Sequence, residues 1–384
     1  MTQNEKKGKI LFAGNFEYKF REFAMAKALN DLGWQIDYFS WKDYKPNSFL
    51  IKILFKYLIG PTIKKINSDL LKKCKEIKPD IVFLYRPLHI RPKTIKRIKQ
   101  YCRLITTWNP DNVFGGYNYK SAWQYKPTGK YRLLAPIIWC EKTLFFKRIW
   151  INVLKSLPLY DFCFVYRAEN IAKYKEAGAK EVYHLPSFYD PQTHRPVALS
   201  KEEQGIFNSD VIFIGHYEPD ERMEYIEALL DNEIKVKLKG EGWDPYLSLK
   251  LKKTFGSKIQ PVFGENYIKT ISGTKIALCF LSKLNKNQYT RRCFEIPACQ
   301  TFLLCERTEI LKQLYEEDKE AVYFSNKGEL ITKTKYYLSH PEDREKIALA
   351  GYQRCISSGY DVKNRMKICD KIFTAKLNPT KSLS

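Results

Sequence analysis

The chain has no C-x-x-C pair, although ten cysteines occur among its 384 residues. Cys293, Cys299 and Cys305 recur every six residues, but no histidine lies nearby to complete a zinc site. No D-x-D metal motif and no paired carboxylates at the spacing of a glycosidase are present either. We therefore expect buried or half-buried free thiols in a reducing compartment, and no bound metal.

Long hydrophobic runs are also missing. No window holds about eighteen uninterrupted apolar residues, so the sequence predicts no transmembrane helix. The N-terminal segment MTQNEKKGKILFAG lacks the apolar core and cleavage site of a signal peptide. These absences lead us to expect a cytoplasmic protein.

Acidic residues are scarce in the first part of the chain. The net charge is +24, and residues 1–155 hold 31 Lys and Arg against 11 Asp and Glu. Such a concentration indicates contact with a polyanion or an anionic membrane surface. No nucleic-acid-binding motif accompanies it, so nucleic acid is not an expected partner. Two lysine-rich apolar segments, 49–66 and 133–154, suit either a membrane interface or core helices of a first domain.

The length exceeds what one hydrophobic core usually serves, and 44% apolar residues are enough for two cores. Apolar runs closed by glycine, such as KILFAG and DVIFIG, alternate with helix-like segments in a βαβ rhythm. The segment PSFYDPQTHRP, with three prolines, interrupts this rhythm. The sequence therefore predicts an α/β fold with two doubly wound, Rossmann-like domains facing a cleft. Their predicted bounds are 1–190 and 206–384, with a linker at 191–205 and a last helix able to pack back on the N-terminal domain.

The segment 288–308, QYTRRCFEIPACQTFLLCERT, combines two arginines and a glutamate at the start of a predicted helix. Arginine forks grip phosphate oxygens, and a glutamate accepts hydrogen bonds from ribose hydroxyls. Arg291, Arg292 and Glu295 therefore suit a nucleotide-diphosphate sugar. The alternative is a helix start with an internal ion pair.

Two further strand ends carry glycines that permit close approach of a phosphate. Gly215 is followed by His216, which could bond a diphosphate or simply occupy a loop, and Arg222 would add a charge at the next helix. Gly240, in KGEGW, could approach a nucleoside or make a plain tight turn.

In the first domain, Asp111 follows a predicted strand within WNPDN. It is a candidate general base or hydroxyl-positioning group on the acceptor side, and the alternative is a turn-forming aspartate beside Pro and Asn. His89, Gly14 and Asn15 are other strand-end candidates.

The blocks FIGHYEPDER, LKGEGW and TRRCFEIPACQTFLLCERTEIL, together with the region behind them, resemble the CgeB-like (spore-maturation-protein type) glycosyltransferases. These are group-1 glycosyltransferases with two Rossmann-like domains, the GT-B type. The resemblance covers about 210–365, and KILFAGN, PDIVFLYR, TTWNPDN and DPQTHRP extend it faintly into the first domain. It implies a UDP- or GDP-sugar donor in the second domain and a polysaccharide, glycan or lipid-linked acceptor in the first.

The resemblance also implies residue roles. Glu295 would hold the donor ribose, Arg291 and Arg292 would face the diphosphate, and Gly215 with Arg222 would form the first phosphate loop. Asn287 stands where group-1 enzymes often carry another glutamate, and Gln300 stands where a small residue is usual. These two departures raise a second hypothesis, a catalytically degenerate GT-B protein with a structural or binding role.

The mechanism that the resemblance implies retains the anomeric configuration and uses no metal and no cofactor besides the nucleotide sugar. Arginine would stabilise the departing diphosphate, so Arg222 and Arg292 join Asp111 as candidate catalytic residues. If Asp111 acted as a base, the reaction could invert instead. The basic N-terminal domain would allow peripheral contact with an anionic inner membrane face.

Overall fold

The computed structural model describes residues 7–44, 46–114 and 124–378. The first six residues of the N-terminal segment MTQNEKKGKILFAG therefore lie outside the described residues. The chain divides into two compact units. Unit 1 comprises Met1–Tyr119, Glu141–Ser187 and Val362–Ser384, and unit 2 comprises Lys120–Cys140 and Phe188–Asp361.

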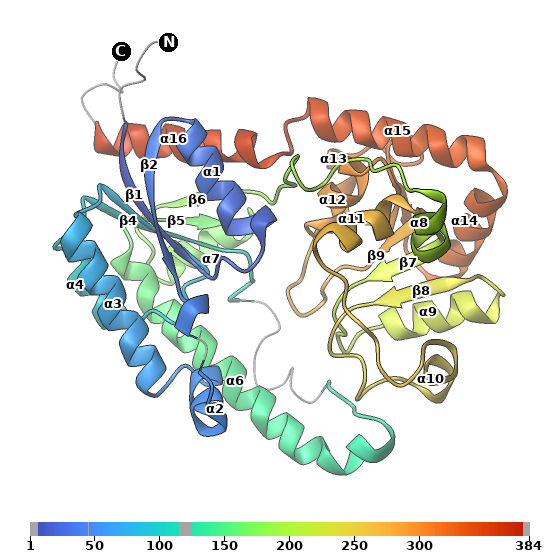
Figure 1. The fold of residues 1–384 in the computed structure, drawn as a ribbon, viewed down its shortest axis with the longest axis horizontal. Coiled ribbons are helices and arrows are strands. Elements are labelled where there is room, and N and C mark those ends of the chain that lie inside the picture. The colour runs from blue at the N-terminus through green and yellow to red at the C-terminus, as the bar shows by residue number, and fades with distance from the viewer. Residues whose placement is uncertain (1–6, 45, 115–123, 379–384) are drawn as a thin grey trace. The chain divides into compact units, whose positions relative to one another are not determined.

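Unit 1 is built on a parallel six-stranded sheet of order β2-β1-β3-β4-β5-β6 (Figure 1). The strands are β1 Gly8–Gly14, β2 Trp34–Ser40, β3 Ile81–Tyr85, β4 Leu104–Asn109, β5 Phe162–Val165 and β6 Val182–His184. The helices are α1 Ala24–Asp31, α2 Phe49–Lys56, α3 Pro61–Ile77, α4 Pro92–Ile98, α6 Ala135–Ser156, α7 Asn170–Glu176 and α16 Val362–Leu377, with short turns at Lys19–Phe23, Lys42–Tyr44 and Leu157–Leu159.

Helices cover both faces of this sheet because successive strand residues point to opposite sides. Leu11 and Val82 pack with Ile66 of α3 in one core cluster. Phe83, on the opposite face, contacts Phe373 of α16 with ring centroids 6.1 Å apart. The C-terminal helix is therefore an integral part of the unit that also contains the first strand.

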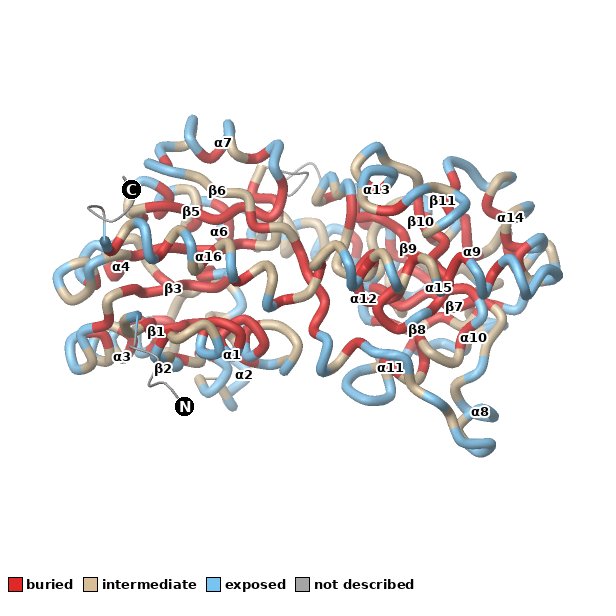
Figure 2. The backbone as a smooth tube through the Cα atoms, turned by 90° about the horizontal axis from the view of Figure 1, so that it is seen from above, coloured by how far each residue is buried: buried red, intermediate tan, exposed pale blue. Residues whose placement is uncertain are grey.

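Unit 2 is built on a parallel five-stranded sheet of order β11-β10-β9-β7-β8. Its strands are β7 Ser209–Ile214, β8 Val236–Lys239, β9 Thr274–Cys279, β10 Phe302–Glu306 and β11 Val322–Phe324. The helices are α8 Lys201–Phe207, α9 Arg222–Asp231, α10 Leu249–Phe255, α11 Gly264–Ser272, α12 Arg292–Ala298, α13 Glu309–Leu314, α14 Lys327–Ser339 and α15 Pro341–Ser357, with a short turn at Gly129–Leu134. Figure 2 shows most of the strands as buried segments inside each unit, whereas β2 and β6 are only partly buried.

The two sheets confirm the predicted α/β class with two doubly wound parallel sheets. In each, the first strand along the chain lies between the second and the third, at β2-β1-β3 and β8-β7-β9. The strand order reverses at this point, and the loops that leave the carboxyl ends on either side open a crevice where ligands of such sheets bind.

The two units are not continuous in sequence, because each includes a segment from the part of the chain that mainly forms the other. Residues 120–140 count with unit 2, where the Thr128 backbone N–H donates to the Pro245 carbonyl at 2.8 Å. Residues 362–384 count with unit 1 because of the packing of α16. The predicted linker 191–205 lies inside unit 2, and its end forms α8, which Ser200 and Glu203 begin with a capping box.

The lysine-rich apolar segment 49–66 is not one helix. It breaks at Gly60, whose φ of 89° precedes α3. None of the residues of α2 is buried, whereas Ile63 and Ile66 of α3 are. In the segment 133–154, the second half of α6 places Ile149 in the core of unit 1. Among the described helices, none combines the length and hydropathy that crossing a bilayer requires.

Candidate functional site

The strand order of unit 2 reverses at the carboxyl ends of β7 and β9, and carboxylates join the loops there. The Ser282 hydroxyl, after β9, donates to Glu218 Oε2, after β7, at 2.8 Å. Glu306, the last residue of β10, accepts from the Leu281 backbone N–H and, at 2.7 Å, from Lys283 Nζ. Three strand ends are therefore held in fixed positions by buried or half-buried acidic side chains.

Arg222, at the start of α9, is directed into this carboxylate network. Its side chain is 5% exposed, and its Nε and Nη2 each donate to the Asp220 carboxylate at 2.7 Å. Its Nη1 donates to the His216 carbonyl at 2.6 Å, and Glu218 lies 3.4 Å away. Burial alone would lower the pKa of Arg222, but these acidic partners outweigh it and raise that pKa. The guanidinium is thus saturated by internal partners when no ligand is bound.

Glu218 is destabilised in its ionised form by burial in this network. Burial raises the pKa of its carboxyl group, and the charge of Arg222 and the hydrogen bond from Ser282 offset the rise only in part. The ionised form is therefore held in place by Arg222, and the two side chains depend on each other.

The packing around Gly215 and Gly240 leaves no room for a side chain at either position. A Cβ on Gly240, whose φ is +147°, would lie 1.9 Å from the Gly215 carbonyl oxygen. A Cβ on Gly215 would lie 2.5 Å from the Phe213 ring. The same Gly215 carbonyl accepts from Trp243 Nε1 at 2.8 Å. These glycines let the β7 and β8 ends touch, a role that is compatible with a phosphate loop but does not require one.

Aromatic rings line the loop after β8. Trp243, which follows the predicted turn at Gly240, is fully buried in the core of unit 2. Tyr217 and Tyr246 stack with centroids 4.2 Å apart and planes 6° apart. His216 is exposed, with Nδ1 3.7 Å from Glu241 Oε2. The histidine therefore lies on the surface of this loop.

Glu295, on α12, is the most enclosed of the predicted binding residues, with 4% of its surface exposed. The Tyr267 hydroxyl donates to its Oε2 at 2.7 Å. His194 Nε2 lies 3.4 Å from Oε1 and Arg291 Nε lies 3.8 Å from it. Burial tends to raise the pKa of Glu295, but His194, Arg291 and the tyrosine together lower it. The carboxyl group is therefore ionised and fixed in orientation.

His194 acts on Glu295 as a neutral ring. Its Nδ1 accepts from the Asp190 backbone N–H at 3.0 Å, which leaves the proton on Nε2, directed toward Glu295. Burial lowers the pKa of His194 in spite of the nearby carboxylate. Sequence reasoning missed both His194 and Tyr267, because the first lies in the presumed linker and the second in a helix that no clear periodicity predicted.

The two arginines of α12 are less enclosed than Arg222. Arg291 lies over the Phe188 ring, 4.8 Å from its centroid, and makes the long ion pair with Glu295 that the alternative interpretation required. Arg292 is partly exposed, and its buried Nε has no hydrogen-bond acceptor. Of the three predicted arginines, Arg292 is the one with a donor left for an anion.

Asp111 lies at the carboxyl edge of the unit 1 sheet, after β4. Arg86 Nε donates to its Oδ2 at 2.6 Å, and its own backbone N–H donates to Asn109 Oδ1 at 3.1 Å. Arg86, at the end of β3, has a φ of 47°, which is unusual for a residue other than glycine. Asp111 is thus both part of a turn and a member of an ion pair.

The other strand-end candidates of unit 1 also have structural partners. The His89 ring stacks on Phe55 with centroids 5.0 Å apart, and burial lowers its pKa to about 4. Gly14 packs against Glu22, because a Cβ there would lie 2.9 Å from Glu22 Cγ. Glu22 is buried and accepts from the Asn15 backbone N–H at 3.3 Å, so it is a carboxylate of this edge that the sequence did not indicate.

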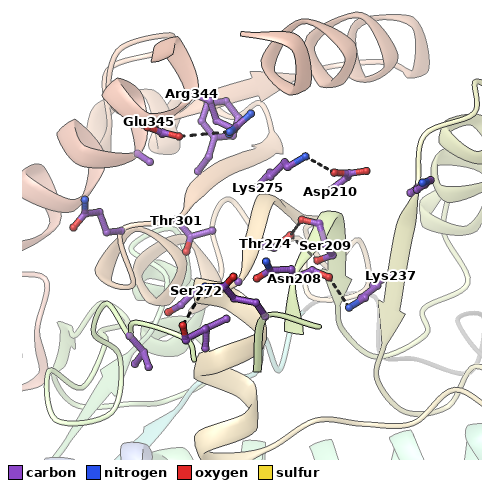
Figure 3. A pocket seen from close by; sticks show the side chains of 18 of the residues that line it. Asn208, Ser209, Asp210, Lys237, Ser272, Thr274, Lys275, Thr301, Arg344 and Glu345 are labelled. Carbon is purple, nitrogen blue, oxygen red and sulfur yellow. Dashed lines mark hydrogen bonds and ion pairs between the residues drawn. The ribbon is translucent and has the colours of Figure 1, made fainter. Parts of the chain in front are cut away.

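A cavity of about 800 Å³ lies at the opposite, amino edge of the unit 2 sheet (Figure 3). Two of the lysines around it have local partners: Lys275 bonds Asp210 at 2.7 Å, and Lys237 bonds the Asn208 carbonyl at 2.7 Å. Ligands of open parallel sheets bind at the carboxyl edge, so this cavity is not the candidate site.

Part of the chain is similar to known proteins in sequence. Residues 222–369 match the family described as "Glycosyl transferase-like". The spore protein CgeB of Bacillus subtilis (strain 168) is 23% identical over 232 residues, which cover 57% of this chain and 69% of that protein.

Two solved structures show the same fold over nearly the whole chain. Sucrose-phosphate synthase from Thermosynechococcus elongatus superposes with a TM-score of 0.62 at 11% identity and covers 96% of this chain and 99% of its own. HepE from Anabaena, solved in complex with UDP-glucose, has a TM-score of 0.59 at 10% identity, and the match covers 95% of this chain and 99% of HepE.

Residues 222–369 are therefore similar to a glycosyltransferase family, and the chain has the GT-B fold. Its resemblance to the CgeB-like group-1 glycosyltransferases, predicted from FIGHYEPDER and the segments that follow it, is confirmed. The matched range 222–369 contains α9 and α12 and hence Arg222, Arg292 and Glu295.

Proposed function

We propose that this protein transfers a sugar from a UDP- or GDP-linked donor to a hydroxyl acceptor, and that the donor binds at the carboxyl edge of the unit 2 sheet. The observation that carries the proposal is α12, which places Arg292, a partly exposed arginine whose buried Nε has no acceptor, one turn before an ionised and oriented carboxylate, Glu295. A phosphate group suits the first and ribose hydroxyls suit the second. The UDP-glucose complex of HepE, which has the same fold, supports this choice of ligand class.

In this proposal Glu295 needs a small rearrangement before it can accept from a ribose. Its Oε1 is buried and makes no hydrogen bond, although His194 Nε2 lies 3.4 Å from it, while Oε2 is held by Tyr267. Movement of the Arg291 side chain, which is 3.8 Å from Oε1, would open that oxygen to the donor. Arg291 would then be free to face the diphosphate.

Donor binding tests the site directly. Calorimetric titration with UDP- and GDP-hexoses should show one donor bound per chain. Arg292→Ala and Glu295→Gln should each weaken binding by about 1.5–3 kcal/mol, the range of a hydrogen bond to a charged group. Glu309→Gln is a matched control, because this glutamate in the first turn of α13 is 80% exposed. Unchanged affinity in both α12 variants would refute the donor site.

We further propose that the reaction retains the anomeric configuration and needs no metal at the diphosphate. Arg292 would stabilise the departing charge, with Arg222 fixing the loop beside it. Product analysis by NMR gives the configuration, and turnover with excess chelator should match turnover with added magnesium. An inverted product would instead favour Asp111 as a base.

We propose that the acceptor is a polysaccharide, glycan or lipid-linked sugar reached at an anionic inner membrane face. The support is α2, where Phe49 is 75% and Leu50 is 70% exposed, in a unit rich in lysine. Exposed apolar side chains among basic ones suit the headgroup region of a bilayer.

Liposome co-sedimentation tests the membrane contact. We expect binding to anionic vesicles, little binding to neutral ones, and loss of binding in a Phe49→Ser/Leu50→Ser variant. The control Leu249→Ser changes another exposed leucine, 80% exposed, on α10 of unit 2. Equal binding to both kinds of vesicle would remove the membrane proposal while leaving the donor site untouched.

A further inference from the structure

Three cysteine side chains converge in the core of unit 2. Cys279 is the last residue of β9, Cys305 lies beside it in β10 as its register partner, and Cys293 on α12 covers both. The sulfur of Cys293 lies 3.7 Å from that of Cys279 and 3.9 Å from that of Cys305. All three sulfurs lie within 4.8 Å of one another, and all three side chains are fully buried.

This spacing is the one that a bound metal ion would require. Metal–thiolate bonds of about 2.3 Å place the sulfurs of a trigonal site about 4.0 Å apart and those of a tetrahedral site about 3.8 Å apart. The two sulfur pairs that involve Cys293 already have these separations. The Cys279 and Cys305 sulfurs, on neighbouring strands, lie within 4.8 Å of each other.

The surroundings supply further groups suited to a metal site. Thr290 Oγ1 lies 3.5 Å from Cys279 Sγ and 4.0 Å from Cys293 Sγ, in the position of a fourth ligand. The Thr290 backbone N–H donates to Cys293 Sγ at 3.4 Å, a contact that stabilises a thiolate. Three sulfurs with at most one oxygen select a soft or borderline ion and disfavour magnesium and calcium.

We propose that Cys279, Cys293 and Cys305 form a binding site for one thiophilic metal ion, zinc(II) or copper(I). Coordination exchanges the thiol protons for the metal, and up to three protons leave to solvent. From the sequence alone we instead expect no bound metal, and the six-residue recurrence considered there includes Cys299 and omits Cys279. Among the described residues, Cys299 is buried but is not a member of the cluster.

A metal here would also fix the helix that carries the proposed donor residues. Cys293 stands one position after Arg292 and two before Glu295 on α12, a helix of only 7 residues. Metal binding would restrain all three side chains together. This coupling rests on the proposed donor site, whereas the metal site itself does not.

The test uses the reduced, metal-stripped full chain. Titration with zinc(II) and with copper(I), each against a chromophoric chelator, should give one tightly bound ion per chain for at least one of the two. Cobalt(II) in the same site should give thiolate-to-metal charge-transfer absorption, a signature that needs no substitution. Cys293→Ala should lower the affinity by at least about 100-fold, since loss of a mere outer partner costs 10–100-fold.

Cys299→Ala is the matched control, because it removes another buried thiol of α12's C-terminal end and should leave metal affinity unchanged. Circular dichroism of both variants checks that they fold. If Cys293→Ala does not fold, Cys305→Ala provides a second ligand variant. The proposal is overturned if wild type binds neither ion stoichiometrically, or if the ligand variants and Cys299→Ala bind equally well. Those results would leave donor titration unaffected and so would not bear on the proposed function.

Discussion

Helices α9 and α12 begin at the same edge of the unit 2 sheet, and both carry arginine beside acidic residues, yet they use these charges differently. On α9, every nitrogen of Arg222 has an acidic or carbonyl partner. On α12, Arg292 keeps a buried Nε without an acceptor, and Glu295 is aligned by neutral donors as well as by charge. The difference favours Arg292 over Arg222 as the arginine that would contact a ligand in the proposed site.

The largest expected effect is on protein stability and comes from replacing Arg222, whose side-chain nitrogens all have partners. Arg222→Ala leaves Asp220 and Glu218 buried without their cation, so the free energy of unfolding should fall by about 3–5 kcal/mol. Urea denaturation followed by circular dichroism measures it. Lys327→Ala is the control, since its ion pair with Glu224 is exposed and should contribute at most about 1 kcal/mol. A stable Arg222→Ala protein that no longer binds donor would reverse the comparison and make Arg222 the ligand group.

The next effect concerns the alignment of Glu295. Tyr267→Phe removes the hydrogen bond to its Oε2, and loss of a bond to a buried charge should destabilise the protein by about 1.5–3 kcal/mol. Tyr336→Phe removes a matching bond to Asp343 at the surface and should change stability by less than about 1 kcal/mol. Equal, small changes in both variants would show that Glu295 is not held by this tyrosine.

Titration of His194 distinguishes the α12 network from that of α9, which contains no histidine side chain among the partners of Arg222. Because burial lowers the pKa of His194, the folded state favours the neutral ring. Its contribution to stability is therefore complete above the ordinary histidine pKa of 6.5 and is lost as the pH falls below it.

We expect the unfolding free energy of wild type to fall more steeply between pH 6.5 and 5 than that of His194→Gln, by at most about 1.4 kcal/mol per pH unit for one proton. His216→Gln is the control, because its ring is 71% exposed. If His194→Gln kept the wild-type pH dependence, the histidine would not be titrating in this window.

The strands and most of the α/β order could be predicted from the sequence, because each strand is a short apolar run that ends at glycine or a polar turn. The run predicted at 210–214 is β7 at Ser209–Ile214, and the one at 301–305 is β10 at Phe302–Glu306. Helices α8, α10 and α11 were not predicted, since they have 7 to 9 residues and few apolar positions. Short helices of this kind are fixed by caps and tertiary packing more than by their own pattern.

The candidate site was predictable in its residue types but not in its partners. Glu295 and Arg292 could be found because they stand at a helix start after a strand. His194 and Tyr267 could not, because each lies far along the sequence from Glu295, and no local period reports which side chains meet after folding. The same reason hid the cysteine cluster, whose member Cys279 falls outside the visible six-residue recurrence.

The smallest expected effect extends the comparison to unit 1, whose strand edge carries the exposed pair of Arg86 and Asp111. Because Arg86 is 47% and Asp111 is 23% exposed, Asp111→Asn should change the unfolding free energy by no more than about 1 kcal/mol. Transfer to acceptor should nevertheless fall while donor hydrolysis in the absence of acceptor stays the same, if Asp111 positions the incoming hydroxyl. If transfer and donor hydrolysis fell equally, Asp111 would have no specific role toward the acceptor. If neither activity fell, Asp111 would be a turn residue, in agreement with the hydrogen bond from its backbone N–H to Asn109.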